Sequence, residues 1–407
     1  MINRFYIVFF VLMLLLSFSC SKYEVHTENN IDIKKLSIEN IETQLDIIHI
    51  TADSAPLAYM MAYAHEDIEI NAGFNMYSEG KPMITNKPIE LKIKGTSTVF
   101  YDLKSLKVKF NKKVNNQIIP IIQVENPLAN HHLEVLKKIS LRNSGNDFYG
   151  TFIKDISYSE LAIQLGLDFE LSYYKPVQVF INHQYYGLLN LRTEKDDNSL
   201  GKLLDVDNED INILKISHIG DGQEIIGFSS GDSLIIQNFI DAVKRKDSPF
   251  LLENVDLSCF ADYIIFEDYI GNSDWPYNNV QIYNVGPQGK FRFFLYDLDF
   301  AADKDKLFVA ETSYNGFLKL LYDALIQDVH FVELLQQRQA YIYKNATVDL
   351  FDHILGINGH RIENDIIYNI AKYQTPTNEI MWYYELQRLS EKFETRRKLF
   401  KWYYQLD

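Results

Sequence analysis

Four polar side chains between positions 274 and 299 are of the types that handle phosphate groups. Asp274 and Asn279 stand five positions apart in a polar segment, and Asp297 and Asp299 follow an aromatic and β-branched run. Phosphoryl transfer needs one carboxylate that orients or deprotonates a hydroxyl, and an amide and a second carboxylate that hold magnesium against the phosphates. We therefore expect Asp274 to act as the base, and Asn279 with Asp297 or Asp299 to bind a metal ion.

The spacing of these residues matches known phosphate-transfer motifs in part. Asp274 and Asn279 reproduce the Asp-to-Asn spacing of the protein-kinase loop H-R-D-x-x-x-x-N, although the His-Arg pair is absent. Asp299-Phe300-Ala301 is similar to the D-F-G motif. Either motif alone is common by chance, since an Asp-x-Asp pair is often a solvated strand end. Their order around a predicted hairpin favours a shared site.

A helix, a loop and a hairpin are predicted to position these residues. Apolar residues at helical spacing predict a helix over 261–270, which Gly271 ends. Pro276 constrains the loop that follows. The runs VQIYNV and KFRFFLYD predict two strands, joined by the turn Gly-Pro-Gln-Gly at 286–289. The second strand would deliver both aspartates beside the loop.

Five motifs follow one another along the chain in an order that identifies a family. They are LKIKGTSTVFYDLKSLKVKF, the segment Leu141-Arg142-Asn143 with Asp147 downstream, NHQYYGLLNLRTEKDD, the loop around Asp274, and the final D-L-D turn. From about Ile89 to the C-terminus, this pattern resembles the spore-coat-protein-H (CotH) kinase family of secreted, atypical protein kinases. Each motif is weak alone, but five in this order are fairly specific.

The resemblance implies an α+β, two-lobed, atypical protein-kinase-like fold, with a β-rich lobe over 45–200 and a mainly helical lobe over 201–407. It also implies ATP with Mg²⁺ or Mn²⁺ as cofactors, and hydroxyl groups of a surface or secreted protein as acceptors. Kinases place one lysine on the α- and β-phosphates and pair it with a carboxylate. Alignment with the family leaves Lys104 and Lys107 as candidates for the lysine, and Glu194 for the carboxylate.

The chain departs from the family pattern at this carboxylate. The family has Glu directly after Leu-Arg, whereas Thr193 stands here and Glu194 follows one residue later. Leu189 also replaces a tyrosine of the pattern. If Glu194 does not take the missing role, nucleotide binding is weakened or lost. The alternative is therefore a catalytically inactive surface-binding or structural lipoprotein with the same fold.

The first 19 residues predict a lipoprotein signal peptide. An apolar run follows Arg4, is too short for a comfortable membrane span, and ends in small residues before Cys20. Lipidation of Cys20 would anchor the exported chain to a membrane, at the bacterial outer membrane or the cell surface, through a tether over 20–44. The alternative is ordinary secretion with an incidental Cys20.

The composition argues against several other kinds of protein. The 407 residues carry a formal charge of −15, and no basic run of five or more residues occurs, which disfavours nucleic acid as a partner. Only Cys259 remains once Cys20 is lipidated, so neither a disulfide scaffold nor a Cys-rich zinc site is expected. The histidines are scattered, and neither H-E-x-x-H nor G-x-S-x-G is present. Zinc catalysis and hydrolase chemistry are therefore unsupported.

Other segments carry more general predictions. No G-x-G-x-x-G is present, and Gly95 to Thr98 is expected either to supply backbone N–H groups to phosphates or to be an ordinary turn. An amphipathic helix is predicted over 154–165, and a hairpin is predicted with its turn at His183-Gln184. The Gly-rich, polar segment 218–232 is expected to be an exposed loop, and helices are expected to predominate from Ser233 onward.

Overall fold

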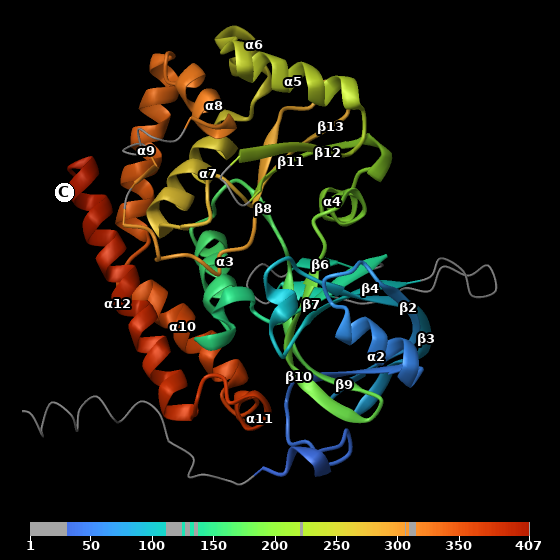
Figure 1. The fold of residues 1–407 in the computed structure, drawn as a ribbon. Coiled ribbons are helices and arrows are strands. Elements are labelled where there is room, and N and C mark those ends of the chain that lie inside the picture. The colour runs from blue at the N-terminus through green and yellow to red at the C-terminus, as the bar shows by residue number, and fades with distance from the viewer. Residues whose placement is uncertain are drawn as a thin grey trace, which may run out of the picture.

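The computed structural model describes residues 31–110, 124–126, 131–133, 137–219, 223–305, 307–308 and 315–406. The predicted signal peptide, Cys20 and residues 20–30 of the predicted tether lie outside the described residues. A barrel, a second sheet and a set of helices make up most of the described part of the chain (Figure 1). In these ranges, none of the helices has the length and apolar character that crossing a bilayer requires.

Seven strands form a closed barrel in the order β1, β2, β3, β4, β7, β10, β9. Neighbouring strands are antiparallel, except that β9 and β1 pair in parallel and close the barrel. Since successive residues of a strand face opposite sides, Ile48 and Ile50 of β1 join the main core, whereas Ile47 joins a separate cluster outside it. The strands are β1 (Asp46–Ala52), β2 (Glu69–Ser78), β3 (Lys81–Lys94), β4 (Ser105–Phe110), β7 (Lys138–Arg142), β9 (Tyr174–Ile181) and β10 (Gln184–Thr193).

The residues that precede the barrel pack against it. This segment contains the short 3-10 helix η1 (Ile33–Lys35), and helix α2 (Ser54–Ala62) follows β1. Ile33, Leu36, Ile38 and Ile41 contact the outer cluster of the barrel, which is made of Ile47, Phe180, Tyr185 and Tyr368. The described part of the predicted tether is therefore packed onto the barrel.

A second sheet has five strands in the order β12, β11, β13, β14, β8. Its strands are β8 (Glu170–Leu171), β11 (Ile211–Ile219), β12 (Gln223–Ser230), β13 (Val280–Val285) and β14 (Arg292–Leu295), and the pair β5 (Val124–Asn126) and β6 (His131–Leu133) forms a separate ribbon. The predicted hairpin after the polar loop is confirmed as β13 and β14.

The prediction of an exposed loop over 218–232 is wrong in part, because residues 223–230 form the edge strand β12. This strand pairs antiparallel with β11, and Leu214 lies opposite Phe228. Between its glycine and polar residues, this segment contains a few apolar residues. These are enough to form a strand that is only partly buried.

The helices gather mainly beside the barrel and around the second sheet (Figure 1). Helix α7 (Leu257–Ile270) is the central one, since every residue from Cys259 to Ile270 is buried. The other helices of the described residues are α3 (Lys154–Gln164), α4 (Asp197–Leu204), α5 (Ser233–Arg245), α6 (Ser248–Asn254), α8 (Phe317–Leu325), α9 (Val329–Asn345), α10 (Val348–Ile362), α11 (Ile366–Tyr373) and α12 (Glu379–Tyr404), with the 3-10 helices η2 (Thr98–Phe100), η3 (Gly145–Tyr149) and η4 (Asn208–Asp210).

Helices and sheets together make an α+β protein, which confirms the predicted class. The helix predicted over 154–165 is confirmed as α3, and the predicted hairpin is confirmed as β9 and β10. Its turn was predicted one residue too late, because Asn182 and His183 form the turn and Gln184 already begins β10. Periodicity predicts strands one at a time, and it does not indicate that seven of them close into a barrel.

Candidate active site

A cavity of about 810 Å³ lies where the barrel meets the second sheet. Residues of β3, β7 and β10 line it from the barrel, and residues of β11, the loop after α7 and the turn after β14 line it from the other side. The charged lining consists of four cations and three carboxylates, namely Lys94, Arg142, Arg192 and Lys195, with Asp274, Asp297 and Asp299. The chain carries a net charge of −15, so a lining with more cations than carboxylates is a local reversal that suits an anionic ligand.

The loop that carries Asp274 is anchored to the central helix. Helix α7 ends where Gly271 takes a φ of 63°, a conformation that glycine adopts at little cost. Trp275 is fully buried, and its Nε1 donates a hydrogen bond to the Tyr263 hydroxyl at 3.2 Å. The side chain next to Asp274 is therefore fixed on α7, and Asp274 itself is held at the cavity.

Asp274 accepts two amide hydrogen bonds from its own loop. Its Oδ2 accepts from Asn278 Nδ2 at 2.9 Å and from Asn279 Nδ2 at 2.7 Å. Burial raises the pKa of the Asp274 carboxyl, although the hydrogen bond from Asn278 opposes this shift. A carboxylate that is more basic than usual is better suited to accept a proton from a hydroxyl.

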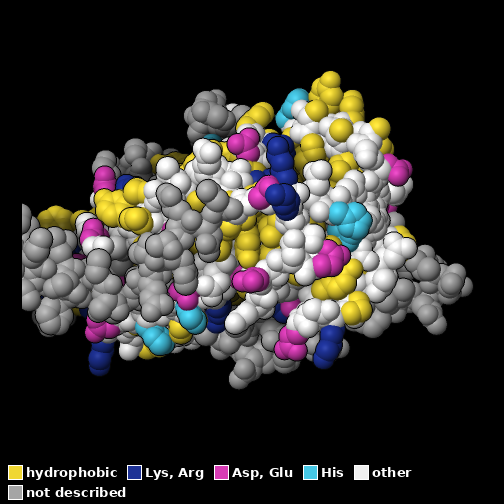
Figure 2. Space-filling view, turned by 90° about the horizontal axis from the view of Figure 1, so that it is seen from below, with side chains coloured by type: hydrophobic (Ala, Val, Ile, Leu, Met, Phe, Trp, Pro, Cys, Tyr) yellow, Lys and Arg dark blue, Asp and Glu magenta, His cyan; other side chains and the backbone are white. Residues whose placement is uncertain are grey.

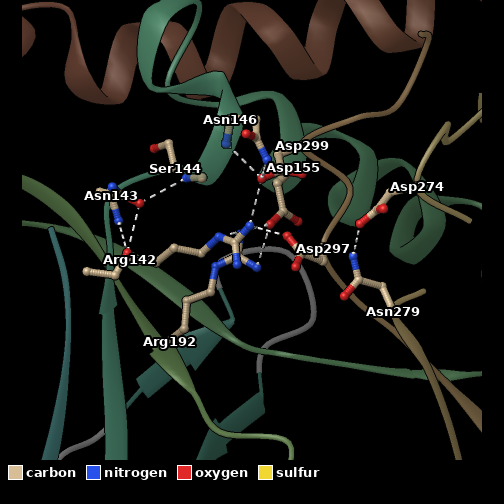
Figure 3. Close-up of polar contacts among 12 residues, drawn as sticks. Arg142, Asn143, Ser144, Asn146, Asp155, Arg192, Asp274, Asn279, Asp297 and Asp299 are labelled. Carbon is tan, nitrogen blue, oxygen red and sulfur yellow. Dashed lines mark hydrogen bonds and ion pairs between the residues drawn. The ribbon is translucent and has the colours of Figure 1, made fainter. Parts of the chain in front are cut away.

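The two carboxylates after β14 both contact Arg142 (Figure 3). Strand β14 ends at Leu295 and Asp297 has a φ of 65°, so the chain has left the regular strand before these aspartates. Arg142 Nη2 forms an ion pair with Asp297 and another, at 3.0 Å, with Asp299. Burial disfavours the charge of both acids, but Arg142 lowers the pKa of Asp297, whereas the charge of Asp297 helps to raise the pKa of Asp299. Arg142 thus compensates Asp297 more fully than Asp299.

Arg142 is one of two arginines on adjacent barrel strands. It ends β7, Arg192 lies on β10, and Figure 3 shows their guanidinium groups side by side. Asp155 of α3 lies 3.7 Å from Arg142 Nε and 3.1 Å from Arg192 Nη1. One buried carboxylate therefore reduces the repulsion between the two arginines, and both still line the cavity, where planar guanidinium groups are well suited to phosphate oxygens.

A close backbone approach holds Asp299. Its Oδ2 accepts hydrogen bonds from the backbone N–H of Asn146 at 2.8 Å and from the side-chain amide of Asn146 at 3.2 Å. Gly145 has a φ of 62°, and a Cβ atom there would collide with Asp299 Oδ2. Asn143 Oδ1 accepts a hydrogen bond from the Gly145 N–H at 3.1 Å. The Leu-Arg-Asn motif and the turn after it therefore form a cradle for Asp299.

Glu194 is the carboxylate partner of two lysines. It is 7% exposed, and its two oxygens accept from Lys94 Nζ at 2.6 Å and from Lys107 Nζ at 3.3 Å. The Ser140 hydroxyl also donates to Glu194. Burial disfavours the charge of Glu194, but Lys94 and then Lys107 bring the pKa of this carboxyl far below its usual value. Glu194 is thus ionised and bound to the lysine that lines the cavity.

Of the two lysines chosen from the sequence, only Lys107 reaches Glu194. Lys104 Nζ donates instead to the backbone carbonyls of Val99 and Tyr101, both at 2.8 Å, and so fastens the turn that contains η2. Sequence analysis missed Lys94, which precedes Gly95 in the K-G-x-S-(S/T)-like motif. The position of Lys94 in that motif could have identified it as the lysine that pairs with Glu194.

Three further cavity residues were given no role by the sequence analysis. Arg192 and Lys195 flank the Glu194 segment, and His218 comes from β11 on the other side. Lys195 Nζ lies 3.1 Å from the centroid of the Tyr296 ring, and burial brings the pKa of this ammonium well below its usual value. An anion bound beside Lys195 would favour the charged form of this side chain.

The three predicted metal ligands all line the cavity, but they are engaged with protein groups. Asn279 donates to Asp274, and Arg142 contacts Asp297 and Asp299. Within the described ranges, no group of three or more His, Cys, Asp and Glu side chains has the geometry of a metal centre. The structure therefore gathers these ligands at one cavity without arranging them around a common point.

Glu194→Gln is expected to lower the stability of the protein near neutral pH, and to lower it less in acid. The folded-state pKa of Glu194 is lowered, so its charge contributes stability above the unfolded-state pKa of about 4.3, and this contribution is lost as the pH falls further. Breaking a buried ion pair costs about 3–5 kcal/mol. We expect about 2 kcal/mol here, because the Lys94 side chain is 36% exposed. Urea unfolding of both proteins across this pH range measures the difference.

Glu90→Gln provides the matched control for this variant. Glu90 lies on β3 and pairs with Lys109 on β4, but it is more exposed than Glu194. Its replacement should change stability much less. A Glu194→Gln effect that stays constant from neutral pH into acid would contradict the assignment of its charge to this ion pair.

An α+β chain with an acid–lysine pair, paired carboxylates and a cationic cavity has features of kinase-like phosphate chemistry. A comparison with family models matches residues 91–400 to the CotH kinase protein family. This match spans most of the chain, and we conclude that the chain belongs to the CotH kinase family, as its motifs predict. A comparison with curated proteins finds no match.

Proposed function

We propose that this chain is an exported protein kinase that transfers the terminal phosphate of ATP to hydroxyl groups of a surface or secreted protein. The observation that carries the proposal is that the Lys94–Glu194 pair, Asp274 and the two carboxylates after β14 meet at one cavity. In this proposal the barrel acts as the small lobe of a two-lobed kinase-like arrangement, and the second sheet with its helices acts as the large lobe.

The cationic lining supports the binding of a polyphosphate. The cavity, at about 810 Å³, lies within the range of roughly 300–1,000 Å³ that is usual for small-molecule sites. Lys94 is fixed by Glu194, and Arg142 and Arg192 are fixed by Asp155, so these cations are oriented before a ligand arrives. The turn from Gly95 to Thr98 also lines the cavity and is suited to offer N–H and hydroxyl groups to phosphate oxygens.

Asp274 is the residue best suited to act on the acceptor hydroxyl. Its carboxylate lies at the cavity, is oriented by two amide hydrogen bonds, and has a raised pKa. It would accept a hydrogen bond from the hydroxyl, orient its oxygen toward the phosphate, and take up the proton that is released.

The donor chemistry of the cavity fits Mg²⁺ or Mn²⁺. Asp297, Asp299 and Asn279 offer only oxygen ligands, which hard divalent cations prefer, and the raised pKa of Asp299 indicates negative charge that the surrounding protein compensates incompletely. These three residues would hold the ion. When bound, the ion neutralises charge on the phosphates. Arg142 would exchange at least one carboxylate contact for a phosphate oxygen.

A second candidate function is a surface-binding module that does not transfer phosphate. One observation favours it, because Arg142 contacts both of the carboxylates that are predicted to bind metal. If these ion pairs persist in the presence of ATP and a divalent ion, the ligand set cannot form. Nucleotide binding then distinguishes the two functions.

ATP with Mg²⁺ or Mn²⁺ is expected to stabilise the protein against thermal unfolding. A ligand present at 100 times its Kd adds about 2.7 kcal/mol to the free energy of unfolding. Lys94→Met should lose most of this stabilisation, because Lys94 lines the cavity, and Lys107→Met should lose part of it through Glu194. Thermal scans at increasing ATP, with and without the metal, measure these differences.

Lys104→Met is the matched control, since the Lys104 ammonium binds two backbone carbonyls rather than Glu194. A flat response of the unmodified protein at high ATP would favour the binding module. Equal ATP affinity in the unmodified protein, Lys94→Met and Lys107→Met would remove these two lysines from the site.

A further inference from the structure

A second cavity, of about 590 Å³, lies on the outer side of the barrel and contains two histidines. It is bordered by Glu39 of the N-terminal segment, by His49 of β1 and by His183 in the turn between β9 and β10. Figure 2 views this end of the molecule from below, and there Lys, Arg, Asp and Glu side chains are interspersed and histidine side chains reach the surface. The cavity is separate from the candidate active site, with which it shares no lining residue.

The parallel pairing that closes the barrel brings these histidines together. His49 of β1 lies opposite Phe180 of β9, and the chain then reverses through Asn182 and His183, which have φ of 49° and 66°. The two imidazole rings are 4.6 Å apart between centroids and tilted by 49°. Residues more than a hundred positions apart in the sequence therefore form a pair, which scattered histidines in a sequence do not reveal.

The His49 imidazole has an unsatisfied nitrogen. His49 is only 5% exposed, and within the described residues its Nε2 has no hydrogen-bond partner. A buried polar nitrogen without a partner costs about 1–3 kcal/mol. A bound ion at this nitrogen would remove that cost.

The surroundings of His49 keep its imidazole in the neutral form. Burial, and then the neighbouring His183, lower the pKa of His49, against the effect of Glu39. The neutral imidazole is the form that binds metals. Glu39 is exposed, and its own pKa is lowered by a hydrogen bond from Ser37 and further by the two histidines, so it contributes a negative charge beside the pair.

We propose that His49 and His183 form a two-imidazole site for a late first-row transition-metal ion, Cu²⁺ or Zn²⁺. Imidazole nitrogen suits these ions, and Cu²⁺ should bind more tightly than Zn²⁺ by the general order of divalent affinities. Glu39 supplies compensating charge, and water completes the coordination, because the described residues provide no third ligand in place. This site does not depend on the proposed kinase activity.

Titration of the full chain, free of any affinity tag, with Cu²⁺ and separately with Zn²⁺ tests the site by calorimetry. One saturable site per chain is expected. His183→Asn should weaken it at least about tenfold, and Asn tolerates the left-handed turn conformation that position 183 requires. His49→Gln should weaken binding similarly. In electron paramagnetic resonance, Cu²⁺ should show two nitrogen ligands in the unmodified protein and one in His183→Asn.

His65→Gln is the control, because His65 is another exposed histidine but does not border the cavity. Its affinity for both ions should equal that of the unmodified protein. The site is refuted if His183→Asn binds Cu²⁺ as tightly as the unmodified protein, or if neither ion binds. It is also refuted if the bound ion is lost in Asp299→Asn and retained in His183→Asn, because the ion then lies in the carboxylate cavity.

Discussion

Asp274→Asn should retain ATP binding and lower phosphoryl transfer by about 10²- to 10⁴-fold, the usual contribution of a general base. The asparagine oxygen can still accept hydrogen bonds from Asn278 and Asn279, so the loop should keep its shape. The substitution removes only the carboxylate that takes the proton from the acceptor hydroxyl. Transfer of labelled phosphate from ATP to the chain itself or to an added protein, together with ATP affinity, measures the two effects separately.

Ser273→Ala is the control for this variant, since Ser273 is the exposed neighbour of Asp274 in the same loop. It should leave both binding and transfer unchanged. If Asp274→Asn transfers phosphate at the normal rate, Asp274 is not the base. If Asp274→Asn loses ATP binding as well, Asp274 also takes part in binding ATP. The proposal that it acts only in phosphoryl transfer is then wrong.

The local part of the candidate site could be predicted from the sequence. Asp274 and Asn279 lie in one short loop between a strongly apolar helix and a hairpin with a clear turn, and such short-range patterns fix which residues are near one another. The structure confirms that helix and hairpin. It also places Asp297 and Asp299 at the same cavity as the loop.

The choice of lysine could not be made in the same way, because it depends on strand register. Lys92 of β3 lies opposite Lys107 of β4, and Lys94 lies opposite Ser105, which puts Lys94 and Lys107 diagonally across the pair and within reach of Glu194. A shift by one residue would turn each of these side chains to the other face. Register is set by tertiary packing, so the sequence pattern alone did not distinguish Lys94 from its neighbours.

Pairing between strands that are far apart in the sequence explains what else was missed. Arg142 and Arg192 lie on β7 and β10, which are far apart in the sequence and become neighbours only in the folded sheet, with Arg142 opposite Asn190. His49 and His183 meet for the same reason. Glu194, which comes one residue later than the family glutamate, still pairs with Lys94. It can do so because β10 ends at Thr193, so the alternation of side chains along the strand no longer fixes the side to which Glu194 points.

Asp297→Asn and Asp299→Asn should both lower metal-dependent ATP binding, by at least about 100-fold if each carboxylate is a ligand, yet they should change stability in opposite directions. The pKa of Asp297 is lowered in the folded state, so its charge contributes stability that is present above the unfolded-state pKa, and its removal should destabilise the protein. The pKa of Asp299 is raised, so its charge opposes folding at higher pH. Without ATP, Asp299→Asn should therefore be more stable than the unmodified protein above neutral pH.

Asp303→Asn is the control for both variants, because Asp303 is a nearby aspartate that pairs with Lys154 and Lys392 near the surface. Its ATP and metal binding should be unchanged. Calorimetric titration with ATP in the presence and absence of Mg²⁺, and urea unfolding at neutral and higher pH, give the two readouts. Loss of metal dependence in only one variant identifies whether Asp297 or Asp299 is the metal ligand. If both variants keep metal-dependent ATP binding, the metal site is not at this turn, and the proposed kinase activity of the chain fails with it.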